Sequence, residues 1–152
     1  MKKNYRIVFI VLMAFFLSSC LESNLDDLPV FKDAEITDFK FEHRWIKDDG
    51  KFAVMQLNNS VDIDHVNNLV VNTITIPGAS GNFPEEVRSQ ITLASIVAYC
   101  NISVAAVIEP VNGAPKLGVP GDYSAERQYQ VTAADGETKK VWTIKTNLNP
   151  LN

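Results

Sequence analysis

The sequence predicts an all-β fold, an antiparallel β-sandwich of about seven strands. Three observations support this prediction. Apolar and polar residues alternate with a period of two over six or seven short segments, turn-forming residues separate these segments, and only one stretch carries a helix-start signal. A single antiparallel sheet cannot bury two apolar faces, whereas two stacked sheets can. The 152-residue chain also has a length typical of one domain.

The first part of the chain contains two strand segments joined by a tight turn. Residues 36–42 place Phe39 and Phe41 at alternate positions between charged residues. The sequence at 47–50 ends in Asp-Gly, and this dipeptide supplies the positive φ that a tight hairpin turn needs. Residues 52–57 are expected to form the returning strand, and the Asn-Asn-Ser sequence that follows should end it.

A third strand is predicted at residues 69–76, which are rich in β-branched side chains, and Pro77 should end it. The next stretch has two interpretations. A proline followed by two acidic residues is typical of a helix start, so we expect a short helix near residues 84–90. The apolar residues at 91–97 also suit a strand, and the sequence leaves both interpretations open.

The last third of the chain contains three further strands. Residues 101–109 form an apolar segment that is closed by a proline, and a long loop rich in glycine and proline occupies residues 111–125. Residues 127–133 alternate cleanly, Asp-Gly at 135–136 turns the chain, and residues 140–146 return as the last strand.

The first twenty residues have the pattern of a bacterial export signal. Lys2, Lys3 and Arg6 precede an apolar run, Ile7–Leu17, which would span about 16 Å as a helix and is too short for a bilayer core of about 30 Å. Small residues and Cys20 follow, and this Leu-Ser-Ser-Cys sequence resembles the lipobox of bacterial lipoproteins. The resemblance implies cleavage before Cys20 and lipidation of its thiol, so that acyl chains would hold the protein on a membrane.

These patterns divide the chain into four parts. We expect a signal peptide at 1–19, the lipidated cysteine with a flexible acidic tether at 20–33, a β-sandwich domain at 34–147 and a tail at 148–152. The acidic residues close to the lipidation site resemble the export signals of surface lipoproteins in Bacteroidetes. This resemblance implies an outer-membrane location and leaves the cell-surface and periplasmic faces as alternatives.

The closing hairpin carries a family resemblance. The segments at 74–77, 101–114 and 127–146 resemble the Ig-like domains of Bacteroidetes surface lipoproteins, whose pattern ends in a sequence of the form YxVTAxDGxTKxWTI. The position before the final Thr-Ile can be Trp or Tyr, and in this chain two residues separate it from the lysine. The matching residues are Tyr129, Val131, Thr132, Ala133, Asp135, Gly136, Thr138, Lys139, Trp142, Thr143 and Ile144. The resemblance implies an Ig-like β-sandwich that serves in adhesion, glycan capture or spacing of other modules. Residues 78–100 are longer than the family's usual connection, so we expect this insertion to carry features particular to this chain.

Aromatic residues beside turns and loops are the best candidates for ligand binding, because sugar rings stack on aromatic faces while polar neighbours bind the hydroxyls. Trp45 adjoins the first hairpin turn, Tyr123 follows Asp122 in the long loop, and Phe83 follows Asn82 in the insertion. A core or rim position fits each aromatic residue as well. The sequence therefore predicts a non-catalytic binding module for a glycan or a surface protein partner. The alternative is a structural spacer or assembly and adhesion lipoprotein with no small ligand.

Several other classes of function are disfavoured. Beyond residue 19 the chain carries 11 basic and 18 acidic residues, a net charge of −7, which argues against a nucleic-acid partner. Asp62, Asp64 and His65 have a spacing that could hold a cation, but a solvated turn fits them better, and we predict no metal or other cofactor. Cys100 lies among apolar residues and is expected to be an unreactive core thiol, whereas Trp142 should be core by alternation. No nucleophile or phosphate-binding motif is present, so we expect no enzyme activity.

Overall fold

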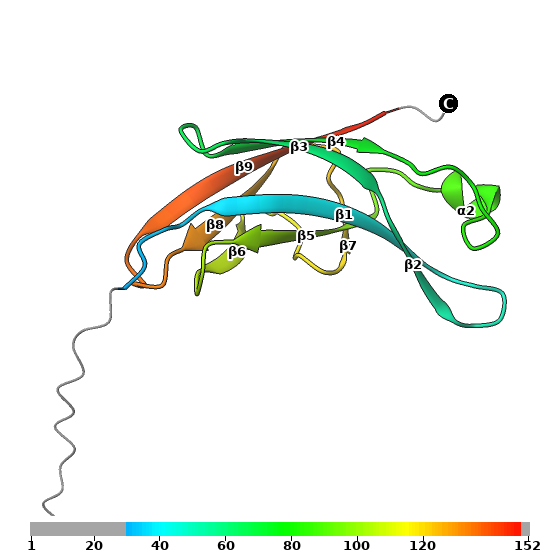
Figure 1. Ribbon diagram of the computed structural model, residues 1–152, viewed down its shortest axis with the longest axis horizontal. Coiled ribbons are helices and arrows are strands. Elements are labelled where there is room, and N and C mark those ends of the chain that lie inside the picture. The colour runs from blue at the N-terminus through cyan, green and yellow to red at the C-terminus, as the bar shows by residue number, and fades with distance from the viewer. Residues whose placement is uncertain (1–29, 150–152) are drawn as a thin grey trace, which may run out of the picture.

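The computed structural model describes residues 30–149, which form two stacked β-sheets (Figure 1). The four-stranded sheet has the order β2-β1-β5-β7, and its strands are β1 (Ile36–Ile46), β2 (Phe52–Gln56), β5 (Ile96–Ile102) and β7 (Pro120–Gly121). The five-stranded sheet has the order β3-β4-β9-β8-β6, and its strands are β3 (Asn58–Asp64), β4 (Leu69–Thr75), β6 (Val107–Val111), β8 (Arg127–Thr132) and β9 (Lys139–Leu148). The predicted all-β sandwich is confirmed, although the described residues contain nine strands rather than about seven.

The expected short helix is also confirmed. α2 (Glu85–Arg88) follows Pro84 and has two acidic residues in its first turn, where a negative charge is favourable. The alternative prediction of a strand at 91–97 is correct only for its last two residues, because β5 begins at Ile96.

The strand pairing differs from the prediction in one place. Among the described strands, every pair is antiparallel except β4 with β9, which runs parallel from Leu69 opposite Thr143 to Ile74 opposite Leu148. Parallel neighbours need a long crossover connection. Here the chain leaves β4, forms β5 in the other sheet, returns for β6 and adds the short β7 beside β5. It then forms β8 and places β9 between β4 and β8. The expectation of a wholly antiparallel sandwich is therefore corrected.

Two predicted strand boundaries are wrong because the chain crosses between the sheets there. The asparagine pair expected to end the second strand instead begins β3, and only Leu57 separates β2 in one sheet from β3 in the other. The Asn59 side chain donates a hydrogen bond to the Phe39 carbonyl oxygen at 2.6 Å, which links the sheets at this crossing. The single strand expected at 101–109 is likewise two strands, because the chain turns at Ala105, which has a φ of 59°, and passes from β5 to β6.

The core lies between the two sheets and is rich in aromatic residues. Phe39 and Phe41 of β1 are fully buried, as are Tyr129 of β8 and Trp142 of β9. The Phe39 ring centroid lies 5.4 Å from that of Phe41 and 6.0 Å from that of Tyr129. Their complete burial confirms that Trp142 and the alternate aromatic residues of β1 belong to the core.

The two ends of the sandwich differ in what they carry. Figure 1 shows the first described residues at one end of the long axis, while the β1–β2 hairpin and α2 lie together at the opposite end. The predicted signal peptide, Cys20 and most of the tether fall in residues 1–29, outside the described residues. Within residues 30–149, no helix has the length and apolar character needed to cross a bilayer.

Candidate functional site

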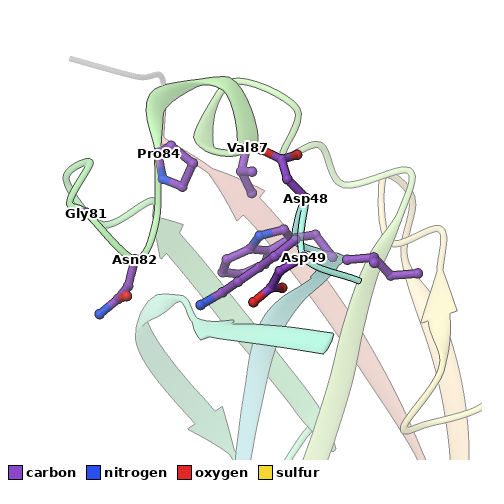
Figure 2. Close-up of a pocket in the computed structure, with 9 residues that line it drawn as sticks. Asp48, Asp49, Gly81, Asn82, Pro84 and Val87 are labelled. Atoms are coloured by element: carbon purple, nitrogen blue, oxygen red, sulfur yellow. The ribbon is translucent and has the colours of Figure 1, made fainter. Parts of the chain in front are cut away.

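A cavity of about 350 Å³ opens at the hairpin end of the sandwich (Figure 2). The tip of the β1–β2 hairpin forms one side, and the segment around α2 forms the other. The lining residues are Trp45, Ile46, Lys47, Asp48, Asp49, Gly81, Asn82, Pro84 and Val87. This volume lies at the lower end of the range of small-molecule sites. Part of the insertion at 78–100 therefore builds one wall of the cavity.

The hairpin side of the cavity is shaped by its turn. Gly50 adopts a φ of 76°, and its N–H donates to the Lys47 carbonyl oxygen at 2.8 Å. The Asp49 carboxylate accepts a hydrogen bond from the Lys51 backbone N–H at 3.0 Å, and its other oxygen lies 3.0 Å from the Lys51 ammonium. These interactions with Lys51 hold the pKa of Asp49 below its usual value. The predicted tight turn is confirmed.

Trp45 reaches the cavity because it continues the inward face of β1. Alternation places Phe39, Phe41, His43 and Trp45 on one face of this strand. The first two are fully buried, whereas His43 and Trp45 lie further along and are half-buried. The His43 and Trp45 rings stack with centroids 5.9 Å apart and an interplanar angle of 15°, and burial lowers the pKa of His43. Trp45 also packs against Phe83, with ring centroids 5.8 Å apart.

The opposite wall is held by a short bridge and by one arginine. Ser80 and Phe83 exchange backbone hydrogen bonds of 2.8 and 3.0 Å, which fold the loop before α2. Arg88 donates from Nε to the Pro77 carbonyl oxygen at 3.0 Å and lies 3.0 Å from the Glu85 carboxylate. The bond to Pro77 ties α2 to the segment that follows β4, whereas the contact with Glu85 lies within the helix.

The structure brings together some of the residues predicted to bind a ligand. Trp45 and the exposed Asn82 line the same cavity, although 36 positions separate them in the chain. The sequence interpretation missed the other seven lining residues, among them Lys47, Asp48 and Asp49, which it assigned only to a turn. The available signal was that these three polar residues follow Trp45 by two to four positions.

Phe83 and Tyr123 require a correction, because both are fully buried and neither can stack on a ligand. Phe83 supports Trp45 from the core side. The Tyr123 ring packs edge-on against Phe41 with centroids 5.2 Å apart, and its hydroxyl lies 3.0 Å from that of Tyr129. Burial raises the pKa of Tyr123 well above its ordinary value. The glycines and prolines around Tyr123 are typical of an exposed loop. In the structure, however, this loop closes over the core and buries the tyrosine.

Asp122 is exposed but does not line the cavity. One carboxylate oxygen accepts hydrogen bonds from the Ser124 backbone at 2.8 Å and from the Ser124 hydroxyl at 2.6 Å, and the other lies 2.7 Å from the Arg127 guanidinium. The hydrogen bonds from Ser124 lower the pKa of Asp122. Its carboxylate therefore stabilises its own loop, and neither Asp122 nor Tyr123 lines the cavity that contains Trp45.

The structure also places Asp64 and Cys100, two further residues that the sequence analysis considered. Oδ1 of Asp64 accepts the backbone N–H groups of Val66 at 2.9 Å and Asn67 at 3.0 Å, which shapes the β3–β4 turn. Cys100 is half-buried, and burial raises the pKa of its thiol to about 11. Among residues 30–149, no three His, Cys, Asp or Glu side chains gather as metal ligands would.

The comparisons with known proteins identify a family. The family described as DUF5018-related matches residues 36–145. A crystal structure from Bacteroides fragilis, of a protein described as secreted, shares 39% sequence identity, covers 80% of this chain and 100% of its own, and superposes with a TM-score of 0.74. A second structure, described as a glycoside hydrolase of Bacteroides thetaiotaomicron, is 21% identical with a TM-score of 0.49, over 84% of this chain but 28% of its own. No curated protein matches the chain. Because the family match spans residues 36–145 and a relative is 39% identical over 80% of the chain, this chain belongs to the DUF5018-related family.

Proposed function

We propose that this protein is a lipid-anchored, non-catalytic binding module of the outer membrane, of the Ig-like type found in Bacteroidetes surface lipoproteins. Acyl chains on Cys20 would hold it on the membrane, and the cavity around Trp45 would bind a glycan. The observation that carries the proposal is the placement of this cavity, at the end of the sandwich opposite the first described residues (Figure 1).

Two features support the anchor. The lipobox-like sequence ends at Cys20, and Leu21–Asp33 could extend at most about 43–47 Å between the lipid and the domain. The relative from Bacteroides fragilis is described as secreted, which agrees with export of this chain. A tether at one end and a cavity at the other would present the cavity away from the membrane.

The lining of the cavity supports a carbohydrate ligand. Trp45 supplies an aromatic face, and its contacts with His43 and Phe83 restrict the ring's movement, so less entropy is lost on binding. Carboxylate, amide and ammonium groups from Asp48, Asn82 and Lys47 surround it. Such a mixture of one aromatic platform and several polar groups suits a ring with apolar faces and a polar edge.

The state of Asp49 supports binding without catalysis. A glycosidase needs a carboxylic acid with a raised pKa to protonate the leaving group. The contacts with Lys51 instead lower the pKa of Asp49, so this residue is a poor proton donor at neutral pH.

We expect Trp45→Ala to weaken binding to glycan-array hits of the wild-type protein by at least tenfold, which corresponds to about 1.4 kcal/mol. Loss of the stacking face is the reason. Isothermal titration calorimetry with each hit measures the change, Trp45→Phe should retain part of the affinity, and Phe31→Ala is the control because that exposed ring does not line the cavity. Equal affinities for wild type and Trp45→Ala, with both proteins folded by circular dichroism, would remove the proposed site.

Cys20→Ala should abolish lipidation of the protein. In cells fed radiolabelled palmitate, we expect the wild type to carry label in the membrane fraction and Cys20→Ala to carry none. Cys100→Ala is the matched control, because it removes the chain's other cysteine and should keep the label. Label that persists in Cys20→Ala would contradict the anchor.

An assembly role is the second candidate, and a surface on the β1–β2 hairpin favours it. Ile46 and Phe52 are paired across the strands and are 72% and 65% exposed, and Val54 beside them is 45% exposed. β2 is also an edge strand. An exposed apolar surface on an edge strand is typical of a contact with another protein. Phe52→Ala separates the two candidates, because it should leave glycan binding intact and disrupt assembly.

A further inference from the structure

The cavity combines an apolar wall with a carboxylate that has no partner within residues 30–149. Pro84 and Val87 form the wall on the α2 side, and Val87 is half-buried and packs against the core, which fixes its position. Figure 2 shows Val87 and Asp48 on the same side of the cavity in that view, with Asn82 on the other. A ligand in this space would meet an apolar surface and a hydrogen-bond acceptor together.

Asp48 differs from its neighbour Asp49 in being free to bind a ligand. Asp49 is occupied by Lys51 through two interactions. Asp48, in contrast, has neither a hydrogen bond nor an ion pair with any residue from 30 to 149. An ionised carboxylate accepts hydrogen bonds and donates none. The site therefore offers an unused acceptor beside Val87.

This pair of features matches a particular substituent on a sugar. A hydroxyl group both donates and accepts, and it gains little from an apolar wall. An acetamido group has an N–H that only donates, a carbonyl oxygen that only accepts, and a methyl group that prefers apolar contact. Asp48 would accept its N–H, Val87 and Pro84 would contact its methyl group, and Asn82 or Lys47 would donate to its carbonyl.

We propose that the cavity selects sugars carrying a 2-acetamido group, such as N-acetylglucosamine or N-acetylgalactosamine, over the corresponding plain hexoses. This inference rests on the proposed glycan-binding function. Trp45 binds the sugar ring in either case, whereas Asp48, Pro84 and Val87 supply the discrimination. The proposed selectivity concerns the substituent at carbon 2 and applies to either orientation of the 4-hydroxyl.

The test compares oligosaccharides that differ only at carbon 2. Chitotriose, cellotriose and the triglucosamine made by removing the acetyl groups of chitotriose are titrated into the full-length processed protein in detergent micelles. A trisaccharide ending in N-acetylgalactosamine and its galactose counterpart form a second pair. We expect the acetamido member of at least one pair to bind at least tenfold more tightly than its plain counterpart, and chitotriose to bind more tightly than triglucosamine.

Variants then assign the preference to residues. Asp48→Ala should reduce the acetamido preference to less than threefold while changing affinity for the plain sugar little, and Val87→Thr should act in the same direction through the methyl contact. Glu109→Ala is the control, since it removes an exposed carboxylate on β6 that does not line the cavity. The Asp48 side chain is exposed, so this variant should fold normally.

Each other outcome has a definite meaning. Equal binding of the acetamido and plain sugars overturns the acetamido inference and leaves the proposed glycan site standing. Tighter binding of triglucosamine than of chitotriose also overturns it, because Asp48 would then attract the ammonium group. Failure of all five oligosaccharides and of every array glycan to bind the wild type overturns the proposed function together with the inference.

Discussion

Trp142→Ala is expected to lower the free energy of unfolding by about 3–5 kcal/mol, the usual cost of removing a large aromatic side chain from a core. Trp142 is fully buried on β9 and lies opposite Tyr129 of β8. Its Nε1–H donates a hydrogen bond to the Ala34 carbonyl oxygen at 3.0 Å. The substitution therefore leaves a cavity between the sheets and a buried carbonyl group without its partner.

Urea unfolding followed by circular dichroism measures this change. Trp142→Phe keeps an aromatic ring but removes the donor to Ala34, so its loss should be smaller, about 1–3 kcal/mol. Val141→Ala, at the neighbouring exposed position, should change the stability by less than about 0.5 kcal/mol. A loss below about 1.5 kcal/mol for Trp142→Ala would contradict the packing described around this residue.

Gly121→Ala is expected to destabilise the protein by about 1–3 kcal/mol through overpacking. A Cβ atom at this position would lie 2.3 Å from Cβ and 2.8 Å from Cγ of Pro115. The proline ring cannot rotate away, because it is bonded to its own backbone nitrogen. Either the loop at 111–119 or the pairing of β7 with Ile96 of β5 must shift.

Gly81→Ala provides the matched control for this effect. A Cβ atom there meets no atom within 4 Å, and the residue does not have a positive φ. The same urea titration should therefore give a stability within about 0.5 kcal/mol of wild type. If Gly121→Ala proves as stable as Gly81→Ala, the close approach of Pro115 to β7 does not exist in solution.

The parts of the fold that depend on local sequence could be predicted. Strands β8 and β9 alternate strictly, and the Asp135-Gly136 turn between them is confirmed, with Oδ1 of Asp135 accepting the Thr138 backbone N–H at 2.8 Å. The errors occur where the chain moves between sheets, at Leu57 and at Ala105. Those crossings depend on packing between distant segments, which no local pattern records.

The candidate site, like the fold, could be predicted only in the parts that depend on local sequence. The sequence identified Trp45 because an aromatic face beside a turn can stack on a sugar ring, and it identified Asn82 as the polar neighbour of Phe83 in the insertion. It could not show that these two residues share a cavity, since α2 must fold against the hairpin first. Phe83 and Tyr123 were misassigned because glycine, proline and polar neighbours hide how completely the ends of the sandwich are covered.

The central place of β9 in its sheet has a consequence for biogenesis. β9 is the last strand within residues 30–149, yet it separates β4 from β8. Until β9 is synthesised, β4 has only β3 as a neighbour in its sheet, and two strands alone are marginal in water. The five-stranded sheet can close only when β9 joins its two parts, so we expect the fold to be completed late in synthesis.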